Sequence, residues 1–216
     1  MPAITWSRAW PAPTPYVKNK AMQKLVIASN NPGKLREFQF LLQPLGIDVL
    51  TQAQLGIEEA EEPHVTFIEN ALAKARHVSR LSGLPALADD SGICVTALGG
   101  APGVLSARYA GLHPRSDARN NEKLLHDMQG VDDRRAHYYC VLVLLHHADD
   151  PQPLIADGEW HGEIAHQERG EGGFGYDPLF WLPSLNKMSA ELPHDEKHAL
   201  SHRGKALRAL LEKLKV

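Results

Sequence analysis

The stretch from residue 24 to residue 50 constrains the fold more tightly than any other part of this sequence. Residues 24–29 form a short apolar, β-prone run that stops at Asn-Asn-Pro-Gly, which is typical of a buried strand entering a loop. From Gly33 onward, apolar residues recur every three or four positions, which predicts a helix of about three turns. Residues 46–50 then predict a second strand. Strand, loop, helix and strand in this order form a βαβ unit, so we expect an α/β fold.

The rest of the chain continues this alternation of helices and strands. Helical spacing predicts helices over residues 66–81, 119–128 and 202–214, with Thr66 and Ser201 as N-caps. Residues 136–147 predict the longest strand, and residues 179–182 a short one. Residues 154–165 alternate around Asp157-Gly158 and Gly162, as a hairpin would. No linker divides residues 22–216, so we expect one domain, preceded by a loosely ordered extension over residues 1–21.

Charge and cysteine content narrow the possible partners. The 23 basic and 26 acidic residues give a formal net charge of −3, which leaves no broad basic surface for a nucleic acid polymer or an anionic membrane. Cys94 and Cys140 each lie in an apolar run, as reduced core thiols do. Residues 1–21 contain no apolar run long enough for a signal peptide or a membrane span. We therefore expect a cytoplasmic protein.

The sequence ALADDSGICV, residues 86–95, places Asp89 and Asp90 between apolar runs. We interpret it as two short strands, residues 85–88 and 93–98, on either side of an Asp-Asp-Ser-Gly turn. Burying an ionised carboxylate is costly unless a cation or several donors meet it. The pair therefore lies either in a surface turn or beside a positive charge.

A second acidic group lies in the stretch GIEEAEEPH, at Glu58, Glu59, Glu61 and Glu62. Mg²⁺ commonly takes one or two carboxylates together with water and substrate phosphates, so a glutamate here and an aspartate from ADDSG suit that ion. A solvated acidic loop is the alternative for the glutamates.

Three further loops carry polar groups in patterns that suit a nucleotide. SNNPGK, residues 29–34, opens a helix and offers backbone N–H groups and a lysine to phosphates, although it is not a Walker motif. The alternative is an ordinary turn in which an asparagine caps the helix. EGGFGYDP, residues 171–178, either brings an aromatic ring close to a ligand or forms a long flexible turn.

The third loop is HDEKHALSHRGK, residues 194–205. His198 and His202 have the i, i+4 spacing of a zinc pair, but no third ligand at matching spacing is nearby. Donors for an anionic or carbonyl-bearing ligand are the better interpretation, and a solvated basic helix start is the alternative.

Taken in order, these motifs resemble one family, the inosine triphosphate pyrophosphatase (RdgB-like) enzymes that act on non-canonical purine nucleoside triphosphates. The matching pieces are S-x-N-x-x-K, AEE followed by TFIENALAKAR, LADDSG with LGGAPGVLSARYAG, GGFGYDP, and EKHALSHRGKAL. They extend from about Met22 to the C-terminus, roughly nine-tenths of the chain. The resemblance implies an elongated, two-lobed, mixed-sheet α/β fold with a central substrate cleft, and a homodimer.

The resemblance also implies an activity: Mg²⁺-dependent hydrolysis of ITP, dITP and XTP to the nucleoside monophosphate and pyrophosphate. By position, Glu61 and Asp90 would bind the metal, Asp90 would also accept the proton from water, and Asp89 would be its partner in the turn. The residues implied for the phosphate chain are Ser29, Asn30, Asn31, Pro32, Gly33 and Lys34. Those implied for the rest of the nucleotide are Ser91, Phe174, Gly175, Tyr176, Asp177, Lys197, His202 and Arg203.

Arg203 gives a partial account of base selectivity, because its side chain has only hydrogen-bond donors. It can donate to the 6-oxo group of hypoxanthine or xanthine, whereas the 6-amino group of adenine would find no acceptor on it. Discrimination against guanine would need a site without room or a partner for the 2-amino group. Two other functions stay open: a pyrophosphatase for other modified nucleotides, and a nucleotide-binding module without turnover. The absent Walker pattern counts against a kinase.

Overall fold

The computed structural model describes residues 22–43, 46–111 and 115–214, and the predicted extension over residues 1–21 lies outside them. One mixed seven-stranded sheet runs through the molecule in the order β2-β1-β3-β4-β5-β6-β7. Its strands are β1 (Lys24–Ile27), β2 (Asp48–Thr51), β3 (Ala86–Val95), β4 (Arg135–Leu145), β5 (Leu154–Ile164), β6 (Phe180–Leu182) and β7 (Lys187–Met188). β1 is parallel to β2 and β3, and every later pairing is antiparallel. The α/β prediction is confirmed.

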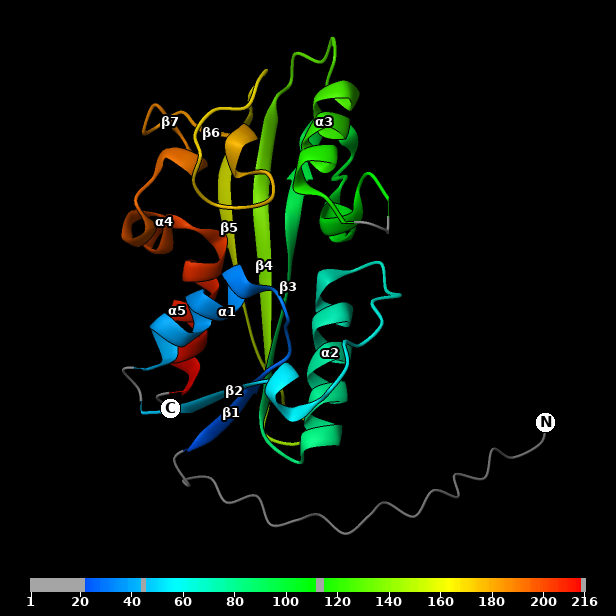
Figure 1. The fold of residues 1–216 in the computed structure, drawn as a ribbon, viewed down its shortest axis with the longest axis vertical. Helices are drawn as coiled ribbons and strands as arrows, with labels where there is room; N and C mark the ends of the chain where they lie inside the picture. The colour runs from blue at the N-terminus through cyan, green and yellow to red at the C-terminus, as the bar shows by residue number, and fades with distance from the viewer. Residues whose placement is uncertain (1–21, 44–45, 112–114, 215–216) are drawn as a thin grey trace, which may run out of the picture.

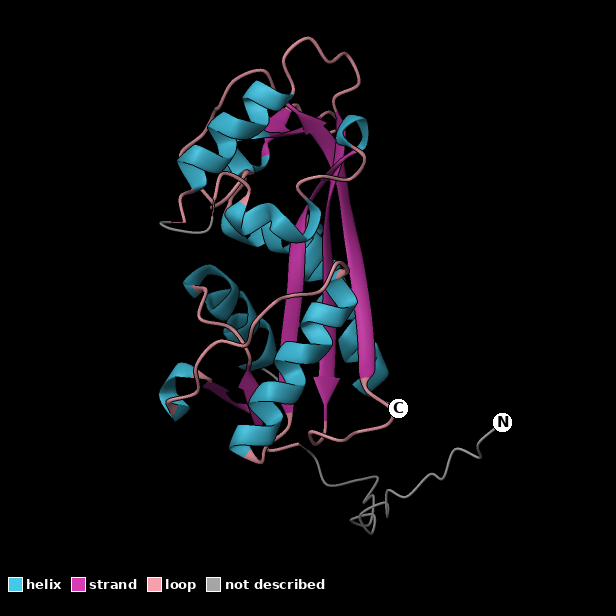
Figure 2. Ribbon diagram, turned by 90° about the vertical axis from the view of Figure 1, so that its right-hand side faces the viewer, coloured by secondary structure: helices cyan, strands magenta, loops and turns pink. Residues whose placement is uncertain are grey.

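Helices cover the sheet unevenly along its length (Figure 1). They are α1 (Pro32–Leu42), α2 (Phe67–Ser82), α3 (Asp117–Asp127), α4 (His194–Leu200) and α5 (His202–Leu214). The long strands β3, β4 and β5 run most of the length of the molecule, with α1 and α5 on one face and α2 on the other at the lower end. The same elongated arrangement, with α3, β6 and β7 at the upper end, is visible from the side in Figure 2. In the described part of the chain, no helix combines the length and apolar character needed to cross a membrane.

Two of the strand predictions are wrong for the same reason. Residues 86–95 do not contain a turn, because all ten form β3 and pair with β4. Residues 154–164 are likewise one strand, β5, rather than a hairpin, and β5 equals β4 in length. The glycines that suggested turns instead allow close packing: a Cβ on Gly92 would lie 2.3 Å from the Gly103 carbonyl oxygen, and one on Gly158 would lie 2.4 Å from that of His202.

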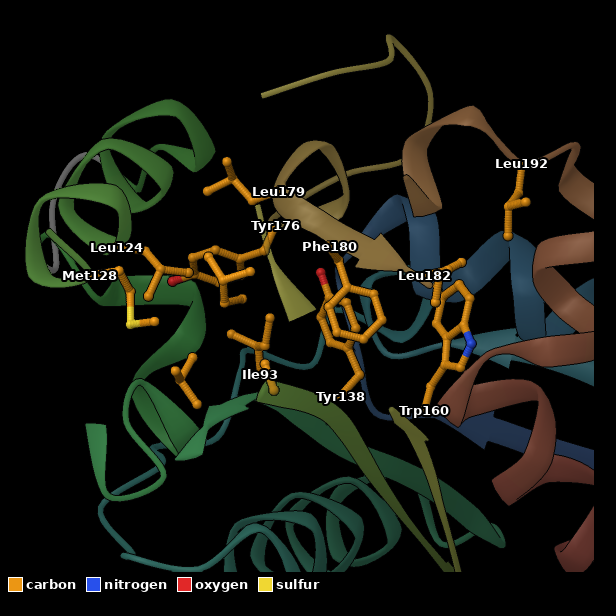
Figure 3. Packing of buried hydrophobic residues seen from close by; sticks show 13 residues of the cluster. Ile93, Leu124, Met128, Tyr138, Trp160, Tyr176, Leu179, Phe180, Leu182 and Leu192 are labelled. Atoms are coloured by element: carbon orange, nitrogen blue, oxygen red, sulfur yellow. The ribbon is translucent and has the colours of Figure 1, made fainter. Parts of the chain in front are cut away.

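The core consists of three clusters that follow this arrangement. One packs α1 and α5 against one face of the sheet through buried residues such as Phe38 and Leu207. The second packs α2 against the opposite face through Ala71 and Val78. The third fills the upper end, where Tyr138 and Phe180 meet edge to face with ring centroids 4.7 Å apart (Figure 3).

Side chains alternate between the two faces along β3, which decides where the aspartate pair points. Leu87 lies in the cluster under α1 and α5, whereas Ala86 and Ala88 lie in the cluster under α2. Asp89 therefore faces α1 and α5, and Asp90 faces α2. Two adjacent carboxylates are thus separated by the thickness of the sheet rather than placed side by side in a turn.

Capping residues set most helix starts as predicted. The Thr66 hydroxyl accepts from the Glu69 N–H at the start of α2, and the Ser201 hydroxyl accepts from the Gly204 N–H at 3.1 Å in the first turn of α5. α3 begins two residues before the predicted position because the Ser116 hydroxyl caps it. α4 was not predicted.

Gly158→Ala tests the close packing of α5 on β5. The added methyl group would push on the backbone of α5 at His202, so we expect the free energy of unfolding to fall by about 2 kcal/mol. Urea denaturation measures this, with Asp157→Ala, a change at an exposed neighbour on the same strand, as the control. Equal stability of the two variants would contradict the proposed contact.

Candidate active site

A cleft of about 580 Å³ opens where segments distant in sequence meet at the middle of the molecule, a volume in the usual range for small-ligand sites. The start of α1, the acidic loop before α2, the centre of β3, the glycine-rich loop before β6 and the junction of α4 and α5 all contribute to its wall. Of the predicted site residues, these line it: Ser29, Asn30, Asn31, Lys34, Glu61, Asp90, Ser91, Phe174, Gly175, Tyr176, Asp177, Lys197, His202 and Arg203. Pro32 and Gly33 do not line it.

Asp89 is fully enclosed on the α1 and α5 face. Lys34 Nζ lies 2.8 Å from its Oδ2, Arg203 Nε lies 3.5 Å from the same oxygen, and the Ser91 hydroxyl donates to it at 3.1 Å. Burial alone would raise the pKa of this carboxyl, but Lys34 and Arg203 outweigh burial and hold the pKa well below its usual range. Asp89 is therefore an ionised carboxylate that holds Lys34 and Arg203 at the cleft.

Asp90 has a different environment on the α2 face. Lys74 Nζ lies 3.1 Å from its Oδ1, and Asn70 Nδ2 donates to Oδ2 at 3.4 Å. Burial raises the pKa of Asp90 above its ordinary value; Lys74 and Lys34 oppose the shift, and Glu62 adds to it. Asp90 is thus the more basic of the two neighbours.

Lys74 also joins Asp90 to the acidic loop. Its ammonium lies 2.7 Å from Glu62 Oε1, and Arg108 Nη1 donates to the other oxygen of Glu62 at 2.8 Å. Burial by itself would lower the pKa of Lys74, but Asp90, Asp89 and Glu62 together raise it. Burial also acts to raise the pKa of Glu62, and Lys74 and Arg108 overcome it and lower that pKa.

Two carboxylates, Glu62 and Asp90, share one lysine at the cleft wall. Within the described ranges of the chain, no three or more histidines, cysteines or acids converge in the way that a metal cage enclosed by protein requires. Two oxygen ligands beside an open cleft do fit Mg²⁺, which keeps most of its shell for water and phosphates. Glu61, the ligand predicted by resemblance, lines the cleft but is exposed, so Glu61 and Glu62 are both candidates beside Asp90.

The loop at the start of α1 is capped by its own side chain. Asn31 Oδ1 accepts from the N–H groups of Gly33 at 2.9 Å and Lys34 at 3.2 Å, and the Asn31 N–H donates to the Ser29 hydroxyl. The expectation of unpaired backbone donors is therefore wrong for these two N–H groups. The role of this loop in phosphate binding stays a prediction.

In the glycine-rich loop Phe174 is partly exposed to the cleft, and the residues that follow it are held by hydrogen bonds. Phe174 is 37% exposed, and the Lys197 ammonium lies 5.1 Å and the Arg203 guanidinium 5.9 Å from the centroid of its ring. Asp177 accepts from the Phe174 N–H at 2.7 Å and from Lys197, while the buried Tyr176 donates its hydroxyl to the Ser106 carbonyl. Asp177 and Tyr176 thus hold the loop in shape.

The junction of α4 and α5 buries His202 and Arg203. The Arg203 guanidinium donates to Glu37 Oε2 at 2.5 Å and to the Ser91 hydroxyl at 3.0 Å. His202 stacks on Tyr138 with ring centroids 4.7 Å apart, and burial lowers its pKa well below the ordinary value of 6.5. His198 meets His194, with their Nε2 atoms 3.2 Å apart, so the His198–His202 zinc pair is not formed.

Sequence reasoning missed five residues of this site. They are Glu37, Glu62 as an ion-pair partner, Asn70, Lys74 and Arg108. For two of them a signal existed: Asn70 and Lys74 are four residues apart on the face of α2 that also carries Ala71, Ala75 and Val78. Polar residues on an apolar helix face need partners, and Asp90 is the partner here.

The chain is similar in sequence to one protein family and to named relatives over most of its length. The model of the Ham1 family matches residues 25–213. A protein named dITP/XTP pyrophosphatase from Ralstonia nicotianae is 64% identical over 90% of this chain and 98% of its own. A protein of the same name from Nitrosomonas europaea is 64% identical over 89% of this chain and 95% of its own.

Solved structures agree with this. A HAM1 protein from Coxiella burnetii is 47% identical, with a TM-score of 0.84 over 90% of this chain and 99% of the other. The Ham1 protein from Staphylococcus aureus is 39% identical, with a TM-score of 0.80 over 89% of this chain and 98% of the other.

The burial of His202 has a measurable consequence. Below pH 6.5 the unfolded chain protonates this imidazole while the folded protein keeps it neutral. Unfolding then takes up a proton, so His202 should lower the free energy of unfolding by about 1.4 kcal/mol for each pH unit below that value.

Denaturation at several pH values between about 5 and 8 measures this slope. His202→Phe should reduce the slope, because it removes the imidazole while an aromatic ring still stacks on Tyr138. His161→Phe, the same replacement at an exposed histidine, is the control. Identical slopes for His202→Phe and wild type would show that His202 titrates normally.

Proposed function

Because the chain belongs to the Ham1 family, we propose that it hydrolyses dITP, ITP and XTP to the nucleoside monophosphate and pyrophosphate. The observation that carries the substrate class is the 64% identity, over nine-tenths of the chain, to proteins named dITP/XTP pyrophosphatase. The cleft supports the same activity, because it brings a basic carboxylate, several cations and an exposed aromatic ring together.

The reaction is attack of water on the α-phosphorus, with pyrophosphate as the leaving group. Catalysis of such a displacement consists mostly of positioning and charge neutralisation. Asp90 accepts the proton of the attacking water, because its pKa is raised whereas that of Asp89 is lowered. Asn70 and Lys74 hold the Asp90 carboxylate in place for this task.

The triphosphate carries negative charge that the cations of the cleft can meet. Lys34 is paired with Asp89, and Lys197 is paired with Asp177. Phosphate oxygens compete for the same ammonium groups, and Lys34 stabilises the pyrophosphate as it leaves. Ser29, Asn30 and Asn31 precede Lys34 in the same loop, line the same cleft and complete the phosphate site.

Mg²⁺ completes the site in this proposal. Asp90 holds it together with Glu62 or Glu61, and the geometry favours Glu62 because it already shares Lys74 with Asp90. When bound, the ion neutralises phosphate oxygens.

The purine stacks on Phe174, which is exposed next to Lys197 and Arg203. Arg203 uses one N–H for Glu37 and one for Ser91, and its remaining donors suit the 6-oxo group of hypoxanthine or xanthine. Guanine differs from xanthine in carrying a 2-amino donor where xanthine has a 2-oxo acceptor, so in this proposal a site without an acceptor for the 2-amino group excludes guanine.

We also propose a homodimer, on the strength of the resemblance, and a cytoplasmic location, on the strength of the cysteines. The two cysteines are compatible with a reducing compartment, because Cys94 and Cys140 are both free thiols. Sedimentation of the purified protein tests the dimer.

Substrate choice and the role of Asp90 are tested together by measuring pyrophosphate release from ITP, XTP, GTP and ATP. We expect ITP and XTP to be cleaved far faster than GTP and ATP, and Asp90→Asn to lower kcat at least about 100-fold. Asp149→Asn, at an exposed aspartate, serves as the control. Equal rates with all four nucleotides would refute the substrate class, and near-wild-type turnover of Asp90→Asn would remove Asp90 as the base.

The choice between Glu62 and Glu61 is tested by the Mg²⁺ concentration that gives half-maximal activity. Glu62→Gln should raise this concentration at least about 10-fold, because it removes the charge of a metal ligand. Glu61→Gln should raise it less, and Glu58→Gln, in the same loop, should leave it unchanged. A larger effect for Glu61→Gln than for Glu62→Gln would assign the ligand to Glu61 instead.

A further inference from the structure

Two side chains of α3 form hydrogen bonds with the backbone N–H and the backbone carbonyl of one residue in the glycine-rich loop, Gly175. Asp117 Oδ2 accepts from the Gly175 N–H at 2.7 Å, and Asn121 Nδ2 donates to the Gly175 carbonyl oxygen at 3.2 Å. Residues four apart in a helix share one face, so a single helix presents an acceptor and a donor together. α3 and the loop are more than fifty residues apart in sequence, so only the fold brings them together.

Gly175 suits this contact because its backbone adopts a left-handed conformation, with φ at +63°, which residues with a side chain rarely adopt. Asn121 is only 3% exposed, so its side chain is held in one place by its surroundings. Asp117 lines the cleft itself.

We propose that Asp117 and Asn121 are positioning residues that place Phe174 for stacking on the purine. Phe174 lies between two fixed points: its own N–H donates to Asp177, and the next residue, Gly175, is held by α3. A ring on a loop fixed at both points loses little conformational freedom on binding, and this increases affinity. The inference rests on the proposed function, since it assumes that Phe174 receives the base.

The contact differs in kind from a fold-stabilising one. Asp117 is at the surface, and a hydrogen bond there contributes little to the stability of the whole protein. Its loss should therefore loosen the loop and leave the fold intact. Asn121 is buried, so its replacement could unfold α3, and Asp117 is the residue to change.

Asp117→Ala tests the proposal. It should raise KM for ITP about 10-fold and change kcat less than about 2-fold, because the interaction positions the base rather than the reacting phosphate. Asp117→Asn keeps an acceptor oxygen and should restore a KM near that of wild type. Glu122→Ala, on the exposed side of the same helix, is the matched control.

The Phe174→Ala background separates positioning of the ring from a direct contact of Asp117 with substrate. In that background, Asp117→Ala should have no further effect on KM. An unchanged KM for Asp117→Ala in the wild-type background would overturn the proposal, as would a loss confined to kcat.

Amide hydrogen exchange over residues 172–177 gives a readout that needs no activity. Exchange there should be faster in Asp117→Ala than in wild type and in Glu122→Ala, and equal rates would overturn the proposal. If the wild-type protein failed to cleave ITP, the proposed function would fall, whereas the exchange rates would still decide whether α3 holds the loop.

Discussion

The alternation of side chains along β3 is the constraint on which the rest of the structure depends. It sends Asp89 to the face covered by α1 and α5, and Asp90 to the face covered by α2. Each carboxylate is buried and meets its own lysine, Lys34 from α1 and Lys74 from α2. Removing one partner of a buried ion pair typically costs about 3–5 kcal/mol, so these contacts also hold α1 and α2 in register with the sheet.

This arrangement gives two neighbouring acids different chemistry. Asp89 is surrounded by Lys34, Arg203 and Ser91, which stabilise its charged form. Asp90 is opposed by the negative charge of Glu62 and has one lysine to share with it. Asp89 therefore positions Lys34 and Arg203, two cations that can bind phosphates, and Asp90 is suited to accept a proton.

Local signals in the sequence predicted much of the fold, because caps and periodicity are local. Thr66 and Ser201 cap helices where expected, and the first βαβ unit forms as predicted. The errors arose at Gly92 and Gly158, which a single sequence presents as turn residues. Glycine is required at these positions because other backbone segments approach closely: Gly103 approaches Gly92, and His202 approaches Gly158. A single sequence does not show these contacts, because they form between different elements of the fold.

The candidate site was also predicted only in part from the sequence. Motifs identified the segments that line the cleft, but not the partners within it. Nothing local says that Lys74 bridges Asp90 and Glu62, or that Asp177 accepts from Lys197 and fastens the loop. Such pairings depend on which faces of distant elements meet in the folded chain.

The division between the two aspartates is tested most directly by measuring both carboxyl pKa values in the ligand-free protein, by NMR of carbon-13-labelled aspartate assigned with Asp89→Asn and Asp90→Asn. The account predicts that Asp90 titrates above the ordinary value of 3.8 and that Asp89 stays ionised well below it. Equal pKa values, or the reverse order, would contradict it.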